Sequence, residues 1–317
     1  MKITDNIDIL LSVYNGEKYL SQQLESILQQ NHQNWQLIIR DDGSKDGSVR
    51  LINKFIKENP GRARLAQDQL GNIGYSASFT ELLKHSTADY IMFCDQDDIW
   101  YPDKVSELLS EIRLEEQRDP FKPILVFSDM EVVNVELKAI DTLKKQFRLK
   151  QSIPPQSFFL RNYAPGCNMI FNKILLEKAL ETNNIIGYFD YWLALVCCVI
   201  GKVIYVDRPL MKYRLHENNA IGLRVKEEQL FKRFMLAFKT SLKYCFNNKE
   251  YRKIMYSKNI EQIRDIYKQF PDYAAKEVKE FIGIDSGNYF SRKWENIVHP
   301  FIKERYFSEQ LTYIICF

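Results

Sequence analysis

Short apolar runs alternate with helix-like segments through the first third of the chain, and this alternation limits the folds that the chain can adopt. The runs at Ile7–Val13, Trp35–Ile39 and Tyr90–Cys94 predict strands, and Arg64–Gln67 predicts a shorter one. Apolar residues at helical spacing predict helices at Glu17–Gln29, Ser48–Glu58 and Tyr75–His85. Strands that alternate with helices form parallel sheets with right-handed crossovers. We therefore expect an α/β domain with a mostly parallel central sheet.

Side chains suited to ligand binding follow the three long strands of this region. Tyr14 follows the first strand, Asp41 and Asp42 follow the second, and Asp95–Asp98 follows Cys94. The carboxyl ends of parallel strands meet at one edge of a sheet, where α/β proteins bind ligands. An aromatic ring can stack on a base, a carboxylate can accept the imino proton of uracil or thymine, and clustered acids can hold a divalent cation against a diphosphate. The pattern predicts a metal-and-phosphate site at this edge.

The same residues also allow a purely structural interpretation. Asp41-Asp42-Gly43 is a common turn sequence, and Tyr14 alone is typical of a half-buried surface tyrosine. Asp98 or Asp103 can cap the helix that begins near Pro102. The sequence alone leaves both interpretations open.

The alternation breaks in the second half of the chain. A helix at Lys104–Gln117 precedes a strand at Ile124–Val133 that Ser128-Asp129 interrupts, and the polar segment Lys138–Pro155 is expected to be a mobile loop. Further elements are predicted at Asn168–Phe171 (strand), Leu175–Leu180 and Asp190–Ile200 (helices), and Val203–Val206 and Leu210–Tyr213 (closing strands). Strand patterns stop near Leu223. We expect a catalytic domain at 1–223, with halves at about 1–100 and 101–223, and a helical extension at 224–317.

Composition excludes some functions and suggests a compartment. A net charge of +3 is too small to indicate nucleic-acid binding. The six cysteines lack metal-ligand spacing and mostly lie in apolar runs, which predicts free thiols in a reducing compartment. The chain shows no signal-peptide pattern and no apolar run long enough to cross a bilayer, so we expect a location in the cytoplasm or at the inner face of the membrane. The basic amphipathic segment Lys226–Lys258 can either bind an anionic membrane or pack on the catalytic domain.

Three segments together resemble the family 2 glycosyltransferases. These segments are Leu11–Leu20, Asp41–Ser48 and Cys94–Trp100, and the resemblance extends from Ile7 to about Gly222. It implies a GT-A fold with a mixed, mostly parallel sheet and a nucleotide-sugar donor. The sequence Asp-Gln-Asp-Asp-Ile-Trp is similar to that of bacterial rhamnosyltransferase-like members. The Gln-x-x-Arg-Trp sequence of processive synthases does not occur, which favours transfer of a single sugar.

The resemblance also implies roles for individual residues. Donor or nucleotide binding falls to Tyr14, Asp42 and Asp95, metal binding to Asp97 and His216, and the catalytic base to Asp190. An acceptor platform is expected from Trp100, Tyr191 and Trp192. Two positions depart from the family pattern: Phe189 replaces a Glu or His, and Ser78 replaces an Asn. Read without the resemblance, Asp190 is a helix cap, His216 a loop histidine and the aromatic residues part of the core.

These residues predict an inverting glycosyltransferase that uses Mg²⁺ or Mn²⁺, with dTDP-rhamnose or a UDP-sugar as donor. The expected acceptor is a hydroxyl of a cell-surface polysaccharide precursor, which can be lipid-linked. An aspartyl-phosphate phosphatase is a rival, because Asp-x-Asp after a strand also begins that active site. That enzyme requires Thr or Val where Ile99 stands, and it would release phosphate from phosphomonoesters. A non-catalytic carbohydrate- or nucleotide-binding module is the second rival, and it would tolerate Asp190→Asn.

Overall fold

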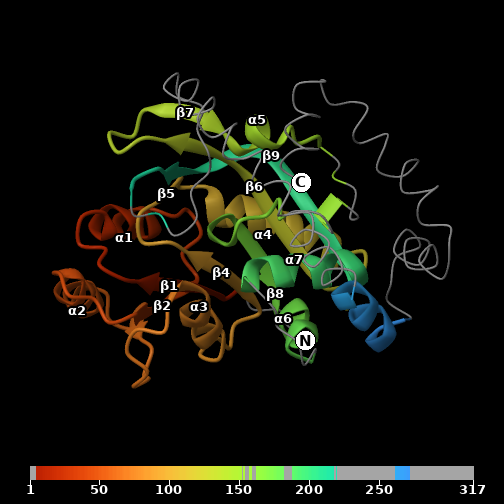
Figure 1. The fold of residues 1–317 in the computed structure, drawn as a ribbon, viewed down its shortest axis with the longest axis horizontal. Helices are drawn as coiled ribbons and strands as arrows, with labels where there is room; N and C mark the ends of the chain where they lie inside the picture. Colours follow the sequence, from red (N-terminus) through yellow and green to blue (C-terminus); the bar gives the residue numbers. More distant parts are fainter. Residues whose placement is uncertain are drawn as a thin grey trace, which may run out of the picture. The chain divides into compact units, whose positions relative to one another are not determined.

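The helices and strands that the structure describes are drawn in Figure 1. The computed structural model divides the chain into two compact units, Met1–Leu223 and Arg224–Phe317. It describes residues 5–151, 153, 157–158, 162–181, 188–217, 219 and 261–271. In the second unit, residues 261–269 form a helix. The basic segment Lys226–Lys258 lies outside the described residues. All of the elements below belong to the first unit.

Four parallel strands form one half of the sheet in the first unit. Strand β1 pairs with β2 on one side and with β4 on the other, and β3 extends the sheet beyond β2. The strands are β1 Ile7–Val13, β2 Trp35–Asp41, β3 Ala63–Leu65 and β4 Tyr90–Cys94. The connecting helices are α1 Leu20–Leu28, α2 Ser48–Glu58 and α3 Tyr75–Leu83. The predicted strands and helices of this half are therefore confirmed, with boundaries shifted by a few residues.

The second half of the sheet introduces antiparallel pairs. The strand order is β3-β2-β1-β4-β8-β6-β9-β5, and β7 pairs with β6. Strand β8 runs antiparallel to both β4 and β6, whereas β9 runs parallel to β6. The strands are β5 Ile99–Trp100, β6 Ile124–Val133, β7 Ala139–Thr142, β8 Met169–Asn172 and β9 Lys202–Arg214. The helices are α4 Lys104–Glu116, α5 Leu143–Phe147, η2 Gly166–Asn168, α6 Lys173–Glu181 and α7 Phe189–Ile200. The sheet is mixed, as expected.

Two predictions for this half were wrong. The segment expected to be a mobile loop contains β7 and α5, which Leu143 and Phe147 anchor by burying their side chains. The side chain of Thr142 caps α5 by accepting a hydrogen bond from the Lys145 backbone. The two expected closing strands are one strand, β9. Its register against β6 shifts at Ser128/Asp129, the position where the sequence predicted an interruption.

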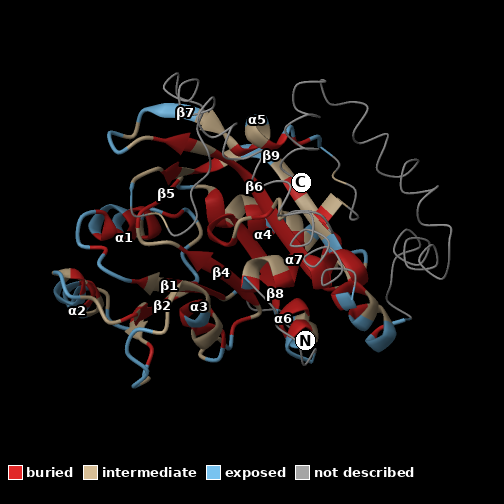
Figure 2. Cartoon of the chain, in the orientation of Figure 1, coloured by how far each residue is buried: buried red, intermediate tan, exposed pale blue. Residues whose placement is uncertain are grey.

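The core follows the central strands and one wholly apolar helix. Figure 2 shows β4, β6 and α7 almost entirely buried, whereas α2 exposes one face. Cys94, Cys167, Cys197 and Cys198 are buried free thiols, which confirms the cysteine prediction for these four. Across the described part of the chain, every helix is too short or too polar to cross a membrane.

Candidate active site

A cavity of about 520 Å³ lies at the carboxyl ends of β1, β2 and β4. The parallel half of the sheet contributes Tyr14, Asp42, Asp95 and Asp97 to its wall. Asp190, from α7 in the second half, lies on the same cavity. Residues that are distant in the sequence therefore share one cavity, at the sheet edge where the sequence predicted a site.

Tyr14 stands at the rim of the cavity with its backbone fixed. The Gln96 amide bridges it on both sides: Oε1 accepts from the Tyr14 N–H at 2.8 Å, and Nε2 donates to the Tyr14 carbonyl at 3.0 Å. This side chain joins the ends of β1 and β4. Tyr14 is 49% exposed, so its ring is available to stack on a ligand.

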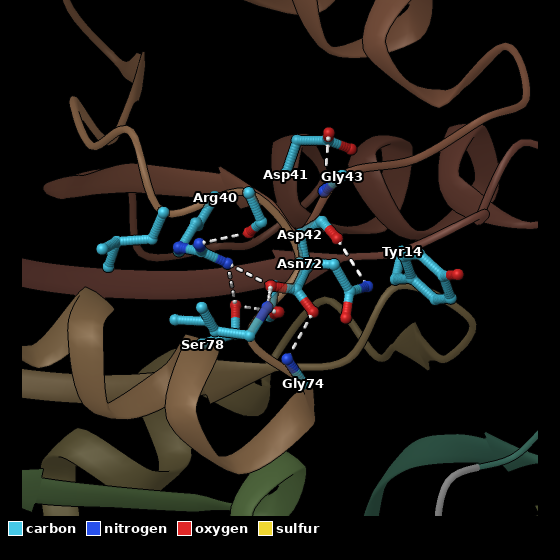
Figure 3. A network of polar contacts seen from close by, with 12 residues as sticks. Tyr14, Arg40, Asp41, Asp42, Gly43, Asn72, Gly74 and Ser78 are labelled. Carbon is cyan, nitrogen blue, oxygen red and sulfur yellow. Dashed lines mark hydrogen bonds and ion pairs between the residues drawn. The ribbon is translucent and has the colours of Figure 1, made fainter.

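Asp41 and Asp42 have different functions, which reconciles the two interpretations of this sequence. Asp41 forms the turn, because its Oδ2 accepts from the N–H groups of Gly43 and Ser44. Asp42 lies on the cavity and is 3% exposed. Its carboxylate accepts from Arg40 and from the backbone N–H groups of Ile73 and Gly74, both at 2.9 Å (Figure 3). The buried carboxylate is therefore paired with a positive charge and held by three donors.

The acids that follow β4, of which Asp97 and Asp98 are buried and Asp95 is half-buried, have far less compensation. Burial and the nearby Asp97 raise the pKa of Asp95 to about 7, although Asp95 accepts a hydrogen bond from the Tyr75 hydroxyl. Burial also raises the pKa of Asp98 well above its usual range. Its Oδ2 has no hydrogen-bond partner among the residues that the structure describes. Three acidic side chains within four positions thus lack sufficient positive charge nearby.

A single buried lysine lies behind these acids. Lys104 is fully buried, donates to the Cys167 carbonyl at 2.7 Å, and lies 4.0 Å from the centre of the Trp100 ring. Burial lowers its pKa to about 8, and Asp98 is one of the acids that oppose this shift. Arg214 adds a second buried cation close to Asp97 and Asp98. Two positive charges do not balance three carboxylates, and the remaining imbalance favours a bound cation.

The end of β9 adds a histidine to the acid cluster. His216 Nε2 lies 2.7 Å from Asp97 Oδ2, and Arg214 Nε donates to the Asp97 carbonyl. Carboxylate oxygen with one imidazole is a donor set that fits Mg²⁺ or Mn²⁺. Potential ligand atoms of Asp95, Asp98 and Cys167 also lie within 4.8 Å of one another. The residues present therefore fit a divalent cation, and the structure brings Asp97 and His216 together as the sequence predicted.

Asp190 lies in the first turn of α7 and is not its cap, since the cap position is Tyr188. Its Oδ2 accepts from the Gly166 N–H and the Asn162 side chain, both at 3.1 Å. Burial raises the pKa of Asp190. A carboxylate held in place on a cavity with a raised pKa is suited to proton abstraction.

The expected acceptor platform requires correction. Trp100 and Trp192 are 2% and 3% exposed and lie outside the cavity wall, so their rings are part of the core. Tyr191 does line the cavity. Tyr188, which sequence reasoning missed, lines it too and is 52% exposed. Its position two residues before Asp190 was the available signal.

The two departures from the family pattern are accommodated by packing. Phe189 is buried, and its ring lies 4.5 Å from that of Phe93 and 5.0 Å from that of Phe79, centre to centre. Ser78 is buried, and its hydroxyl lies 2.6 Å from that of Ser12. An apolar cluster thus occupies the position of the missing acid, next to the proposed base.

The sheet order and the solved structures of similar architecture define the fold as GT-A. The Staphylococcus aureus protein TarS 1–349, solved in complex with UDP, matches with a TM-score of 0.55 and 13% identity, over 98% of this chain and 78% of that one. The complex of TarS 1–349 with UDP-GlcNAc matches with a TM-score of 0.52 and 14% identity, over 94% and 81%.

The chain belongs to glycosyl transferase family 2, whose model matches residues 8–179. It is therefore a glycosyltransferase, and neither the phosphatase nor the binding-module interpretation is retained. A curated relative, the dTDP-rhamnosyl transferase RfbG of Shigella flexneri, is 28% identical over 256 residues, which are 77% of this chain and 81% of the relative.

Proposed function

We propose that the chain is an inverting, metal-dependent glycosyltransferase that moves one sugar from dTDP-rhamnose or a UDP-sugar to a hydroxyl of a cell-surface polysaccharide precursor. The observation that carries the proposal is that Asp42, Asp97 and Asp190 line one cavity. The name of the Shigella relative supports the thymidine donor, and the UDP complexes of TarS support the uridine donors.

The nucleoside of the donor is assigned to the Tyr14 side of the cavity. Tyr14 stacks on the base, and Asp42 accepts the imino N–H that uracil and thymine share. Asp95, which the Tyr75 hydroxyl orients, contacts the ribose or the sugar. These three residues bind and orient the donor.

Asp97 and His216 are assigned to hold the divalent cation. When bound, Mg²⁺ or Mn²⁺ neutralises negative charge on the departing nucleoside diphosphate. Asp97 is suited to this function because its backbone is fixed by Arg214 and its carboxylate faces His216.

Asp190 is the proposed base on the acceptor side. It takes the proton of the acceptor hydroxyl as that oxygen attacks the anomeric carbon, and direct displacement inverts the configuration. The Gly166 N–H and the Asn162 side chain orient one carboxylate oxygen. Tyr188 and Tyr191 line the cavity, and we assign these aromatic residues to contact with the acceptor sugar. A lipid-linked acceptor would place the enzyme at the inner face of the membrane.

A screen of nucleotide sugars tests this proposal. The purified chain is mixed with thymidine, uridine, guanosine and cytidine diphosphate sugars, and release of the nucleoside diphosphate is measured with Mg²⁺, with Mn²⁺ and with a chelator. We expect release from a thymidine or uridine donor that depends on the metal. Release that is equal in the chelator, or release only from a guanosine or cytidine donor, would contradict the proposal.

A further inference from the structure

Arg40 is a buried arginine near the end of β2 whose hydrogen-bonding capacity is fully used. It is 1% exposed. Nε donates to Asp68, one terminal nitrogen donates to Asp42 and to Ser78, and the other donates to Asp68 and to the Gly71 carbonyl. An arginine side chain has five N–H groups, and these bonds satisfy every one. Such a side chain is fixed in orientation.

These bonds tie three separate segments to one guanidinium group. Asp42 lies at the end of β2, Asp68 and Gly71 belong to the loop that follows β3, and Ser78 belongs to α3 (Figure 3). The loop itself exposes Leu70, with 52% of its surface accessible. Arg40 is therefore a principal anchor of a loop that has little apolar burial of its own.

The same loop returns to Asp42 through its backbone. Ile73 and Gly74 donate to the two carboxylate oxygens of Asp42, and the Asn72 side chain donates to its carbonyl at 2.8 Å. Gly74 has a φ of 85°, a backbone conformation that favours glycine. Arg40 thus acts on Asp42 twice, by direct pairing and by holding the loop that supplies the other donors.

This arrangement leaves a limited acceptor capacity at Asp42. Oδ1 already accepts from Arg40 and Ile73, whereas Oδ2 accepts only from Gly74 among the described residues. A carboxylate oxygen accepts about two hydrogen bonds. Oδ2 can therefore accept one more donor from the cavity.

We propose that Arg40 is a positioning residue for base recognition, because it fixes Asp42 so that Oδ2 accepts the N3–H of uracil or thymine. The assignment rests on the proposed function. It predicts discrimination against a base that carries no hydrogen at N3, such as cytosine. Cytosine N3 is itself an acceptor, so it would face Oδ2 with no hydrogen between them and the second acceptor position of Oδ2 would stay empty.

Binding of UDP, dTDP, CDP and N3-methyl-UDP, measured by calorimetry with Mg²⁺ present, tests this proposal. The wild type is expected to bind N3-methyl-UDP about ten- to a hundredfold more weakly than UDP, since a hydrogen bond to a charged group is lost. Arg40→Lys keeps the positive charge but loses the planar guanidinium group with its five N–H donors. The ratio of the dissociation constants for N3-methyl-UDP and UDP should therefore fall to about threefold or less. Asp68→Asn keeps Arg40 and weakens the loop anchor, so it should reduce the ratio to an intermediate value.

Arg64→Lys is the matched control. Arg64 lies on the neighbouring strand β3, donates to Gln36 and to the His85 carbonyl, and is outside the cavity wall. This variant should keep the wild-type ratio. A purely structural function of Arg40 would lower the melting temperature without changing the ratio.

The outcomes separate the two proposals. A wild type that binds neither uracil nor thymine nucleotides overturns the proposed donor class and this assignment with it. A wild type that discriminates, with Arg40→Lys and Asp68→Asn discriminating equally well, overturns the assignment alone. If Arg40→Lys does not fold, Asp68→Asn alone tests the assignment: a wild-type ratio of N3-methyl-UDP to UDP affinity in this variant would overturn it.

Discussion

Carboxylates gather at the ends of both β2 and β4, on two sides of the cavity, but the two groups differ in how they are compensated. At the end of β2, Arg40 pairs with Asp42 and Asp68, and backbone N–H groups complete the network. At the end of β4, burial raises the pKa values of Asp95 and Asp98. On the first side, donors of the protein satisfy the carboxylates. On the second side, Asp98 Oδ2 has no hydrogen-bond partner among the described residues and the acids outnumber the nearby cations, which is the arrangement of a cation site.

This difference follows from what each side is proposed to bind. A base is neutral, so recognising it requires fixed hydrogen-bond geometry and no net charge. A diphosphate is an anion and would be repelled by uncompensated carboxylates, so the acid cluster can face it only with a cation between them. Neighbouring strand ends of one sheet can thus support two kinds of recognition.

The largest expected effect comes from the acid cluster. Asp97→Asn should lower kcat/KM for sugar transfer by about a thousandfold, because metal-held charge stabilisation contributes several kcal/mol. Steady-state kinetics with saturating Mg²⁺ measure this loss. Asp103→Asn is the control, since Asp103 pairs with Arg208 outside this cavity. Near wild-type turnover in Asp97→Asn would remove the functional distinction between the two sides.

Asp190→Asn should lower kcat for transfer by roughly a hundredfold or more while donor affinity stays unchanged, because a general base acts on the acceptor. Single-turnover transfer and donor calorimetry together separate the two quantities. Equal turnover in this variant and the wild type would exclude Asp190 as the base. Asp141→Asn, at β7 and outside the cavity wall, is the control.

The stability effects of charge removal should have opposite signs on the two sides. Arg40→Met should destabilise the chain by about 3–5 kcal/mol, because it leaves buried carboxylates unpaired. Asp98→Asn, measured in a chelator, should stabilise it by roughly 1 kcal/mol, because a buried charge without an adequate partner is removed. Urea unfolding of both variants checks the pair of signs. Destabilisation of similar size in both variants would show that the carboxylates at the ends of β2 and β4 do not differ in how they are compensated.

The smallest predicted effect is a shift in pH dependence. The base must be ionised, so the rate should fall as the pH drops through the raised pKa of Asp190, which is above that of an ordinary aspartate. The Asn162 hydrogen bond favours the ionised form, so Asn162→Ala should move this acid limb to still higher pH. The pH profile of kcat measures the shift. Asn134→Ala, in a surface turn, should leave the profile unchanged.

The parallel half of the fold and the acids at its edge were predictable because their signals are local. Largely apolar runs mark β1, β2 and β4, and the acids stand at the ends of β2 and β4. The pairing of Arg40 with Asp68 was not predictable, since the partners lie on different segments that only the fold brings together. Whether Trp100 and Trp192 face the cavity or the core stayed open for a related reason, because helical or strand spacing does not show which ring faces a cavity. The segment containing β7 and α5 was missed because few apolar residues anchor it.

The metal dependence of nucleotide binding tests the central claim most directly. Affinities for uridine and for UDP, and for the matching thymidine compounds, are measured by calorimetry in Mg²⁺ and in a chelator. We predict that removing the metal weakens diphosphate binding at least about tenfold and leaves nucleoside binding unchanged. In Asp97→Asn, removing the metal should have no effect on either affinity. Diphosphate binding that is equally tight in the chelator, or nucleoside binding that is lost with the metal, would contradict the claim.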